Sequence, residues 1–176
     1  LIWQTTNFFI RQNLFENIKV GENSINGQYL STFKNVEVKK DTDTDLTFSA
    51  LPAKYLELPH DKGLFQISSM KNQFDDVFIP IRAGAAGLFN NSPAGKLEKR
   101  IGFWPEGDRV YFTQDLLKKK LNKILIKLVI DSPEDVDIND PYPIPPNLEK
   151  MIIDEVLDVM MPRARQDKVN DANATV

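Results

Sequence analysis

The spacing of apolar residues changes twice along this chain, and this change limits the possible folds more than any other feature. Residues 1–18 and 146–161 are rich in apolar side chains and have the composition of helices, whereas the segments from about 28 to 131 alternate between apolar and polar positions. Asp, Gly and Pro separate the alternating segments, as in short strands joined by turns. The pattern predicts an α+β fold, in which two terminal helices pack together and bracket an antiparallel β-rich insert.

The N-terminal helix carries apolar side chains on several sides. At about 100° per residue, the apolar residues of 1–18 spread around much of the circumference instead of forming one stripe. Such a helix is either a central core helix, or a helix covered partly by its own domain and partly by another subunit. The sequence leaves both arrangements open. The second arrangement would place Trp3, Phe8, Phe9 and Phe15 in an interface.

The clearest strands lie late in the insert. The segment 108–115 alternates, and in 123–131 the apolar residues Ile124 and Ile126 face one way while Lys123 faces the other. Because only a short segment joins these two runs, they are predicted to form a long antiparallel hairpin with one buried face. The Gly- and Ala-rich stretch 82–95 is expected to be a flexible loop.

The C-terminal helix has clear boundaries. Pro145 and Pro146 suit a first helical turn, where the missing N–H groups would be unpaired in any case, and Pro162 ends the helix. The tail from 162 to 176 is polar and has too few apolar residues to fold alone, so it would need a partner to become ordered. Together these segments predict a single domain over residues 1–176.

Composition narrows the class of protein. The chain has 176 residues, of which 41% are hydrophobic and 27% charged, which is typical of a soluble folded protein. Its formal net charge of −3 predicts no general affinity for nucleic acid. It has no cysteine, which excludes disulfides, thiolate zinc sites and cysteine nucleophiles and suits a reducing cytoplasm. With no apolar run of about 18 residues and no signal-peptide pattern at its start, no membrane partner is expected.

Two candidate motifs, one for phosphate binding and one for proton transfer, lack the residues that these functions need. The Gly-Lys pair in "NNSPAGKL" has Asn90 where a phosphate-binding loop needs Gly, and Leu97 where it needs Ser or Thr. The only histidine, His60, lies in the turn-like "LPHDKG" without a recognisable nucleophile beside it. No spacing of carboxylates selects an acid–base pair. The sequence therefore predicts no enzymatic activity and no cofactor.

Two acidic runs, "DTDTDL" and "DVDIND", resemble the start of a calcium-binding loop. Their sixth positions are Leu46 and Asp140 where that loop needs Gly, and their twelfth positions are both Pro where it needs Glu. Neither run is such a loop. An irregular cation site at Asp135, Asp137 and Asp140 stays open beside the simpler interpretation of a solvated acidic loop.

A basic patch precedes the last predicted strand and continues into it. It consists of Lys118, Lys119, Lys120, Lys123 and Lys127. These lysines could contact DNA phosphates along a channel, or keep an exposed strand edge from pairing. They could also meet the acidic segment 131–140 of a neighbouring copy, which would give a head-to-tail contact of opposite charges.

Several phrases of the sequence resemble structural proteins of tailed bacteriophages. They are "LPAKYLELPHDKGLFQIS", "FWPEGDRVYF", "ILIKLVID" and "YPIPPNLEKMIIDEVLDVMM", and with the apolar N-terminal helix they cover nearly the whole chain. The chain is most similar to head–tail connector proteins (neck, ring or adaptor) of crAss-like phages. The resemblance rests on overall layout and these phrases, since no invariant motif defines it.

The resemblance implies a virion protein of the neck or tail region, made in the host cytoplasm. Such a protein docks on the portal, forms a ring of typically twelve copies and extends the DNA channel. Its partners would be itself, the portal protein, and the next ring or tail protein, while genomic DNA passes without sequence-specific binding. No catalytic residue can be transferred from the family, because it has none.

The residues expected in interfaces come from both termini. They are Trp3, Phe8, Phe9, Phe15, Asp135, Asp137, Asp140, Tyr142, Ile152, Val156, Met160, Arg163 and Arg165. Two alternatives to a connector ring remain. One is a minor tail or fibre-docking protein, and the other is a host-directed binding module or enzyme that is absent from the virion.

Overall fold

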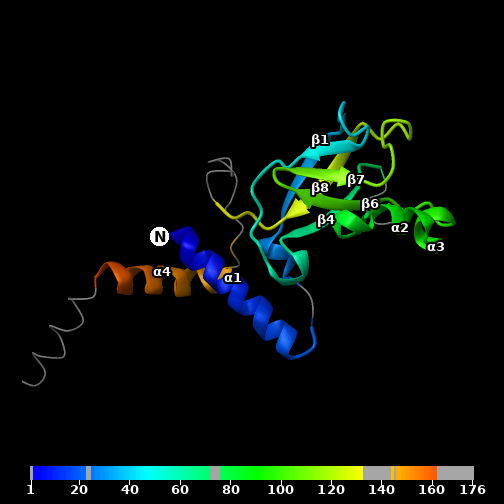
Figure 1. The fold of residues 1–176 in the computed structure, drawn as a ribbon. Helices are drawn as coiled ribbons and strands as arrows, with labels where there is room; N and C mark the ends of the chain where they lie inside the picture. Colours follow the sequence, from blue (N-terminus) through cyan, green and yellow to red (C-terminus); the bar gives the residue numbers. More distant parts are fainter. Residues whose placement is uncertain (1, 23–24, 72–75, 133–143, 145, 162–176) are drawn as a thin grey trace, which may run out of the picture. The chain divides into compact units, whose positions relative to one another are not determined.

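The computed structural model describes residues 2–22, 25–71, 76–132, 144 and 146–161, and the chain divides into two compact units (Figure 1). The first, here called the helical unit, comprises Leu1–Tyr29 and Ile138–Val176. The second, the β unit, comprises Leu30–Asp137. Both ends of the sequence therefore belong to one unit, and the strands between them belong to the other.

The helical unit is built on two helices that contact each other. They are α1 (Ile2–Lys19) and α4 (Pro146–Met160), and a short 3-10 helix, η1 (Gly27–Tyr29), belongs to the same unit. Figure 1 shows α1 crossing α4. The predicted helices at both ends, and their packing together, are confirmed. No helix among the described residues is long and apolar enough to span a membrane.

The first sheet of the β unit has three antiparallel strands in the order β1-β8-β4. Its strands are β1 (Ser31–Glu37), β8 (Lys123–Leu128) and β4 (Leu64–Ser69). The central strand β8 is buried on both faces, because Ile124 and Ile126 on one side and Leu125 on the other are all fully buried. The prediction of one buried face was therefore too narrow: "ILI" is the continuous apolar run of a strand covered on both sides.

The second sheet has five strands in the order β2-β3-β7-β6-β5. They are β2 (Lys39–Lys40), β3 (Thr47–Ala50), β7 (Arg109–Phe112), β6 (Gly102–Glu106) and β5 (Ile79–Pro80). All neighbours are antiparallel except β5 and β6. Gly107, at φ 61°, makes the tight turn between β6 and β7. The two sheets share one core, in which Phe78 and Phe112 meet edge to face at 5.8 Å.

The predicted hairpin between 108–115 and 123–131 is wrong. Its two strands lie in different sheets, because β7 pairs with β3 and β6, whereas β8 pairs with β1 and β4. The physical reason lies in the segment between them, where Leu116 is fully buried in the shared core. The chain therefore crosses from one sheet to the other at Leu116, and the hairpin forms one strand earlier, at Gly107.

The stretch 82–95, expected to be a flexible loop, is largely helical. It contains η3 (Ala83–Ala85), α2 (Ala86–Asn91) and most of α3 (Pro93–Lys96). The Ser92 hydroxyl caps α3 by accepting a hydrogen bond from the Gly95 N–H at 3.2 Å. Gly95 is required there, since a Cβ would lie 2.3 Å from the carbonyl oxygen of Phe89. A further 3-10 turn, η2 (Pro59–Asp61), lies where the sequence predicts a turn.

Candidate assembly surfaces

The first candidate surface is a stripe on α1 formed by Phe8 and Phe15, about two helical turns apart. These side chains are 62% and 52% exposed. They border a shallow hollow of about 550 Å³ together with Arg11, Gln12, Glu16 and Lys19. Trp3 and Phe9 are half-buried, and the rings of Phe8 and Phe9 meet edge to face at 5.7 Å.

In contrast to the exposed Phe8 and Phe15, the side chains of Ile10 and Leu14 are buried. In the single chain, α1 is therefore covered on one side only. A central core helix, one of the two arrangements left open above, does not fit these exposures. Large aromatic side chains exposed along one face are typical of surfaces that take part in molecular contacts.

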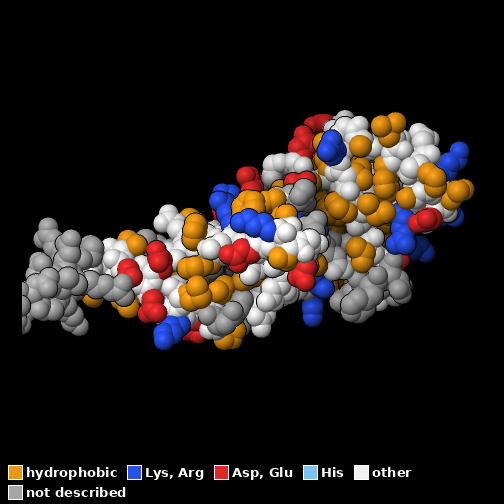
Figure 2. Space-filling view, turned by 90° about the horizontal axis from the view of Figure 1, so that it is seen from below, with side chains coloured by type: hydrophobic (Ala, Val, Ile, Leu, Met, Phe, Trp, Pro, Cys, Tyr) orange, Lys and Arg blue, Asp and Glu red, His pale blue; other side chains and the backbone are white. Residues whose placement is uncertain are grey.

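The second candidate surface is a stripe on α4. Ile153, Leu157 and Met160 recur at helical spacing and are all exposed. Figure 2 shows apolar side chains (orange) at the surface of the helical unit, with acidic side chains (red) among them. Of the residues expected in an interface, Met160 lies on this stripe. Ile152 and Val156 are instead buried within the chain.

Six of the expected interface residues, including the three of the possible cation site, lie outside the described residues. They are Asp135, Asp137, Asp140, Tyr142, Arg163 and Arg165, of which the first three make up the cation site. Within the described ranges, no group of three or more His, Asp or Glu residues is arranged to hold a metal ion. In "DTDTDL" the Asp41 carboxylate accepts a hydrogen bond from the Asp43 N–H at 3.0 Å, which lowers the pKa of Asp41. That acidic run therefore forms a turn that is stabilised by a hydrogen bond between two of its own residues.

The lysines of the predicted basic patch differ in their surroundings. Lys118 pairs with Asp115 at 3.6 Å, and Lys123 lies opposite Glu37 where β8 meets β1. Lys127 is half-buried in the middle of β8, between its two neighbouring strands. Lys119 lines a pocket together with residues outside this patch.

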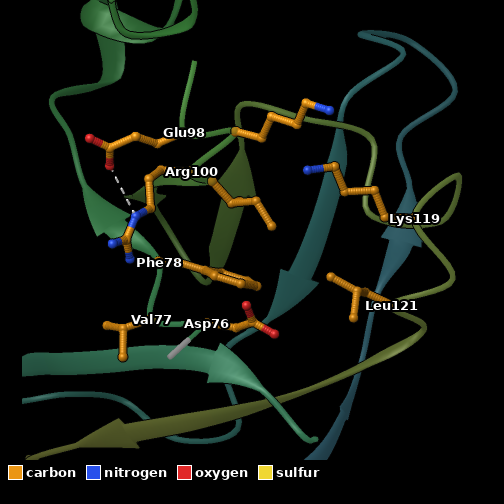
Figure 3. Close-up of a pocket in the computed structure, with 9 residues that line it drawn as sticks. Asp76, Val77, Phe78, Glu98, Arg100, Lys119 and Leu121 are labelled. Carbon is orange, nitrogen blue, oxygen red and sulfur yellow. Dashed lines mark hydrogen bonds and ion pairs between the residues drawn. The ribbon is translucent and has the colours of Figure 1, made fainter. Parts of the chain in front are cut away.

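This pocket is the third candidate surface, and we call it the Lys99–Lys119 pocket. It is a half-open hollow of about 570 Å³ in the β unit. Its lining residues are Asp76, Val77, Phe78, Glu98, Lys99, Arg100, Ile101, Lys119 and Leu121. In Figure 3, Lys119 and Leu121 lie on one side of the hollow, and Arg100 and Glu98 lie on the other.

Charge in the pocket is unevenly balanced. Arg100 and Glu98 form an ion pair at 3.3 Å, drawn as a dashed line in Figure 3. The Asp76 carboxylate accepts a hydrogen bond from the Ser69 hydroxyl at 3.1 Å. Lys119 keeps contact with water, but partial burial lowers its pKa, and the positive charge of Lys99 lowers it further against a smaller opposing effect of Asp76. The pocket is therefore a place where two cations meet over an apolar floor.

Sequence reasoning singled out Lys119 but missed its partners Lys99 and Arg100. The available signal was the basic run "KLEKR" at 96–100, which lies about twenty residues before Lys119 and has no motif of its own. Only the pairing of β6 with β7, and the crossing at Leu116, bring the two basic segments to the same hollow.

The sequence was also compared with known proteins. A family model of crAss-like phage ring proteins, described as phage tail ring protein 2, matches residues 1–175. No curated protein matches the chain.

Proposed function

The chain belongs to the phage tail ring protein 2 family, and on that premise we propose that it forms a closed homo-oligomeric ring at the head–tail connector of the virion. The ring docks on the portal and extends the DNA channel. It is a structural component without enzymatic activity, and it assembles in the host cytoplasm. Following the resemblance described above, twelve copies form the ring.

The observation that carries this proposal is the exposed Phe8–Phe15 stripe of α1. Burying apolar surface contributes roughly 25 cal/mol per Å², and aromatic side chains are among the largest contributors to interfaces. A subunit that leaves two phenylalanines more than half exposed gains this energy only when another molecule covers them. In a ring, each copy supplies that cover through a head-to-tail contact with the next.

The two units would then have separate tasks. The helical unit offers two apolar stripes, on α1 and on α4, and these suit the two contacts that a ring subunit at the portal must make. We assign these stripes to the neighbouring copy and the portal. The β unit has its own closed core and forms the body of the ring, where it faces the next ring or tail protein.

DNA passes through such a ring without being held. A net charge of −3 gives the subunit no overall attraction for a polyanion, and Lys118 of the basic patch is already paired with Asp115. We therefore expect no micromolar or tighter binding of DNA by the purified protein at physiological salt.

Electron microscopy and light scattering of the purified full chain test ring formation. The expected result is a closed ring with an open centre and a mass that is a whole multiple of one subunit. A protein that stays monomeric at high concentration and in the presence of portal contradicts the proposal. Recovery from infected-cell lysate but not from washed virions would favour the host-directed alternative, and a position away from the neck would favour the minor tail protein.

A further inference from the structure

We propose that the Lys99–Lys119 pocket of one subunit receives the acidic segment, residues 134–140, of a second copy of the chain. This contact deepens the proposed function and rests on it, because it gives the ring a second, electrostatic bond between neighbours. The pocket supplies two cations and an apolar floor, and the acidic segment supplies carboxylates and apolar side chains.

Two cations of the pocket take part in no ion pair within the described part of the chain. Arg100 forms an ion pair with Glu98, and the Asp76 carboxylate accepts a hydrogen bond from Ser69. Neither Lys99 nor Lys119 has such a partner among those ion pairs. The pKa of Lys119 is lowered first by partial burial and then by the positive charge of Lys99, so the two ammonium groups repel each other across the hollow. A carboxylate between them would replace this repulsion with attraction.

The backbone that carries the two lysines is ordered. Lys99 and Lys120, the residue after Lys119, adopt φ 54° and φ 59°, a left-handed conformation that lysine rarely takes unless surrounding contacts impose it. Hydrogen bonds supply those contacts. The carbonyl oxygen of Leu116 accepts from the N–H of Lys119 at 3.1 Å and from that of Leu121 at 3.0 Å, while the Gln114 amide donates to the Arg100 carbonyl at 2.8 Å. The backbone at the pocket therefore loses little freedom when an anion binds.

The acidic segment has the matching chemistry. Its residues include Glu134, Asp135, Asp137 and Asp140, with Val136 and Ile138 between the carboxylates. Acidic and apolar side chains thus alternate. The pocket offers partners for both kinds, because Val77, Phe78, Ile101 and Leu121 line it together with the two lysines.

The position of the pocket favours a second copy over the same chain. The pocket lies near the start of β8, since Leu121 lines it and Ser69, which pairs with Ile124 in the sheet, donates its N–H to the carbonyl oxygen of the pocket residue Asp76 at 3.3 Å. The acidic segment follows the opposite end of β8, after Asp131, which is already paired with Lys54 at 3.2 Å. At about 3.3 Å per residue, these ends are roughly 25 Å apart. Because the chain enters the acidic segment from the end of β8 far from the pocket, the pairing of the two suits head-to-tail closure.

A nucleic acid fits the pocket less well. A DNA duplex is too wide to enter a hollow of about 570 Å³. Phosphate groups would also gain nothing from Phe78 and Ile101. A peptide segment can place carboxylates at the lysines and apolar side chains on the floor.

Exchange of charge between two full-length variants tests the proposal. One variant carries Lys99→Glu with Lys119→Glu, and the other carries Asp135→Lys with Asp137→Lys. Ring formation is measured by light scattering and native mass spectrometry. Each variant alone should need about tenfold or more protein than the unchanged chain to form rings, whereas an equimolar mixture should restore assembly. Lys96→Glu with Lys120→Glu is the matched control, which changes the same charge outside the pocket lining and should assemble normally.

The outcomes separate this inference from ring formation itself. Failure of the unchanged chain to form rings would contradict the proposed function and this contact with it. Normal rings from Lys99→Glu with Lys119→Glu would overturn the contact alone. If assembly returned only when all four substitutions were in one chain, the pocket would bind the acidic segment of the same chain. If Lys99→Glu with Lys119→Glu lost only DNA binding, DNA would be the occupant of the pocket. Either result overturns the proposal.

Discussion

The buried hydroxyl of Thr47 accepts a hydrogen bond from the backbone N–H of Leu116 at 3.4 Å and donates one to the neighbouring Gln114 carbonyl at 3.0 Å. Thr47 lies on β3 in the second sheet, and Leu116 lies where the chain crosses to the first. The Thr47 side chain therefore stabilises the segment that crosses between the two sheets. Lys119, which lines the pocket, lies three residues farther along this segment.

Replacing Thr47 should weaken the fold through these two bonds. Thr47→Val keeps the shape of the side chain but leaves a buried N–H without its partner, which should lower the free energy of unfolding by about 1–3 kcal/mol. Thr47→Ser keeps the hydroxyl and should be less destabilising. Urea denaturation of both variants below the assembly concentration measures the difference. A valine variant as stable as the serine variant would show that the hydroxyl contributes nothing.

Two glycines in neighbouring short helices should respond in opposite ways. A Cβ at Gly95 would lie 2.3 Å from the Phe89 carbonyl oxygen, whereas a Cβ at Gly87 meets nothing within 4 Å. Gly95→Ala should lower the melting temperature and the free energy of unfolding, by about 1–3 kcal/mol. Gly87→Ala should be neutral or stabilising by up to about 1 kcal/mol. Equal melting temperatures for the two variants would contradict this local packing.

Substitutions on the exposed face of α1 should affect ring assembly, whereas substitutions on its buried face should affect the stability of the subunit. Phe8→Ser with Phe15→Ser removes exposed apolar surface and should abolish or strongly weaken ring formation while changing the melting temperature of the subunit little. Leu14→Ala, on the buried face, should cost about 2–5 kcal/mol of stability. Light scattering and thermal denaturation of both variants make the comparison. Intact rings from the double Phe variant would remove the stripe from the interface.

Lys119 is expected to lower the stability of the isolated subunit slightly, although it contributes to ring formation. Its pKa is lowered by partial burial and by Lys99, so the folded state favours the neutral amine more than the unfolded state does. Stability should therefore rise with pH as the group loses its proton, because the unfolded chain then binds more protons than the folded one. Lys119→Met should leave subunit stability at neutral pH equal or higher, yet weaken ring formation. Denaturation curves and light scattering check both effects, and a less stable variant that still assembles would contradict them.

The terminal helices could be predicted because local signals define them. Pro146 fixes the start of α4 through its own backbone geometry, and the apolar residues of 1–18 predict a helix at α1 while leaving open whether its own domain or another subunit covers it. The same reasoning failed for β7 and β8. Alternation shows that a segment is a strand but does not identify its neighbours, and Leu116 reveals the crossing only once the core around it is known.

The surfaces were predictable to different degrees for a similar reason. Phe8 and Phe15 stand on a single helix, so their spacing places them on one face before the fold is known. Lys99 and Lys119 come from separate connections, and a long-range contact is needed to bring them together. The five clustered lysines differ in their surroundings because a strand begins among them: Lys123 and Lys127 lie on β8, whereas Lys118 pairs with Asp115 before it.

Reconstruction of the virion neck and tail by electron microscopy tests the central claim most directly. The account predicts a closed ring of this chain around the DNA channel at the portal, with the Phe8–Phe15 stripe covered by another subunit. A particle in which the chain is absent, or is present as isolated copies with that stripe exposed, would contradict it.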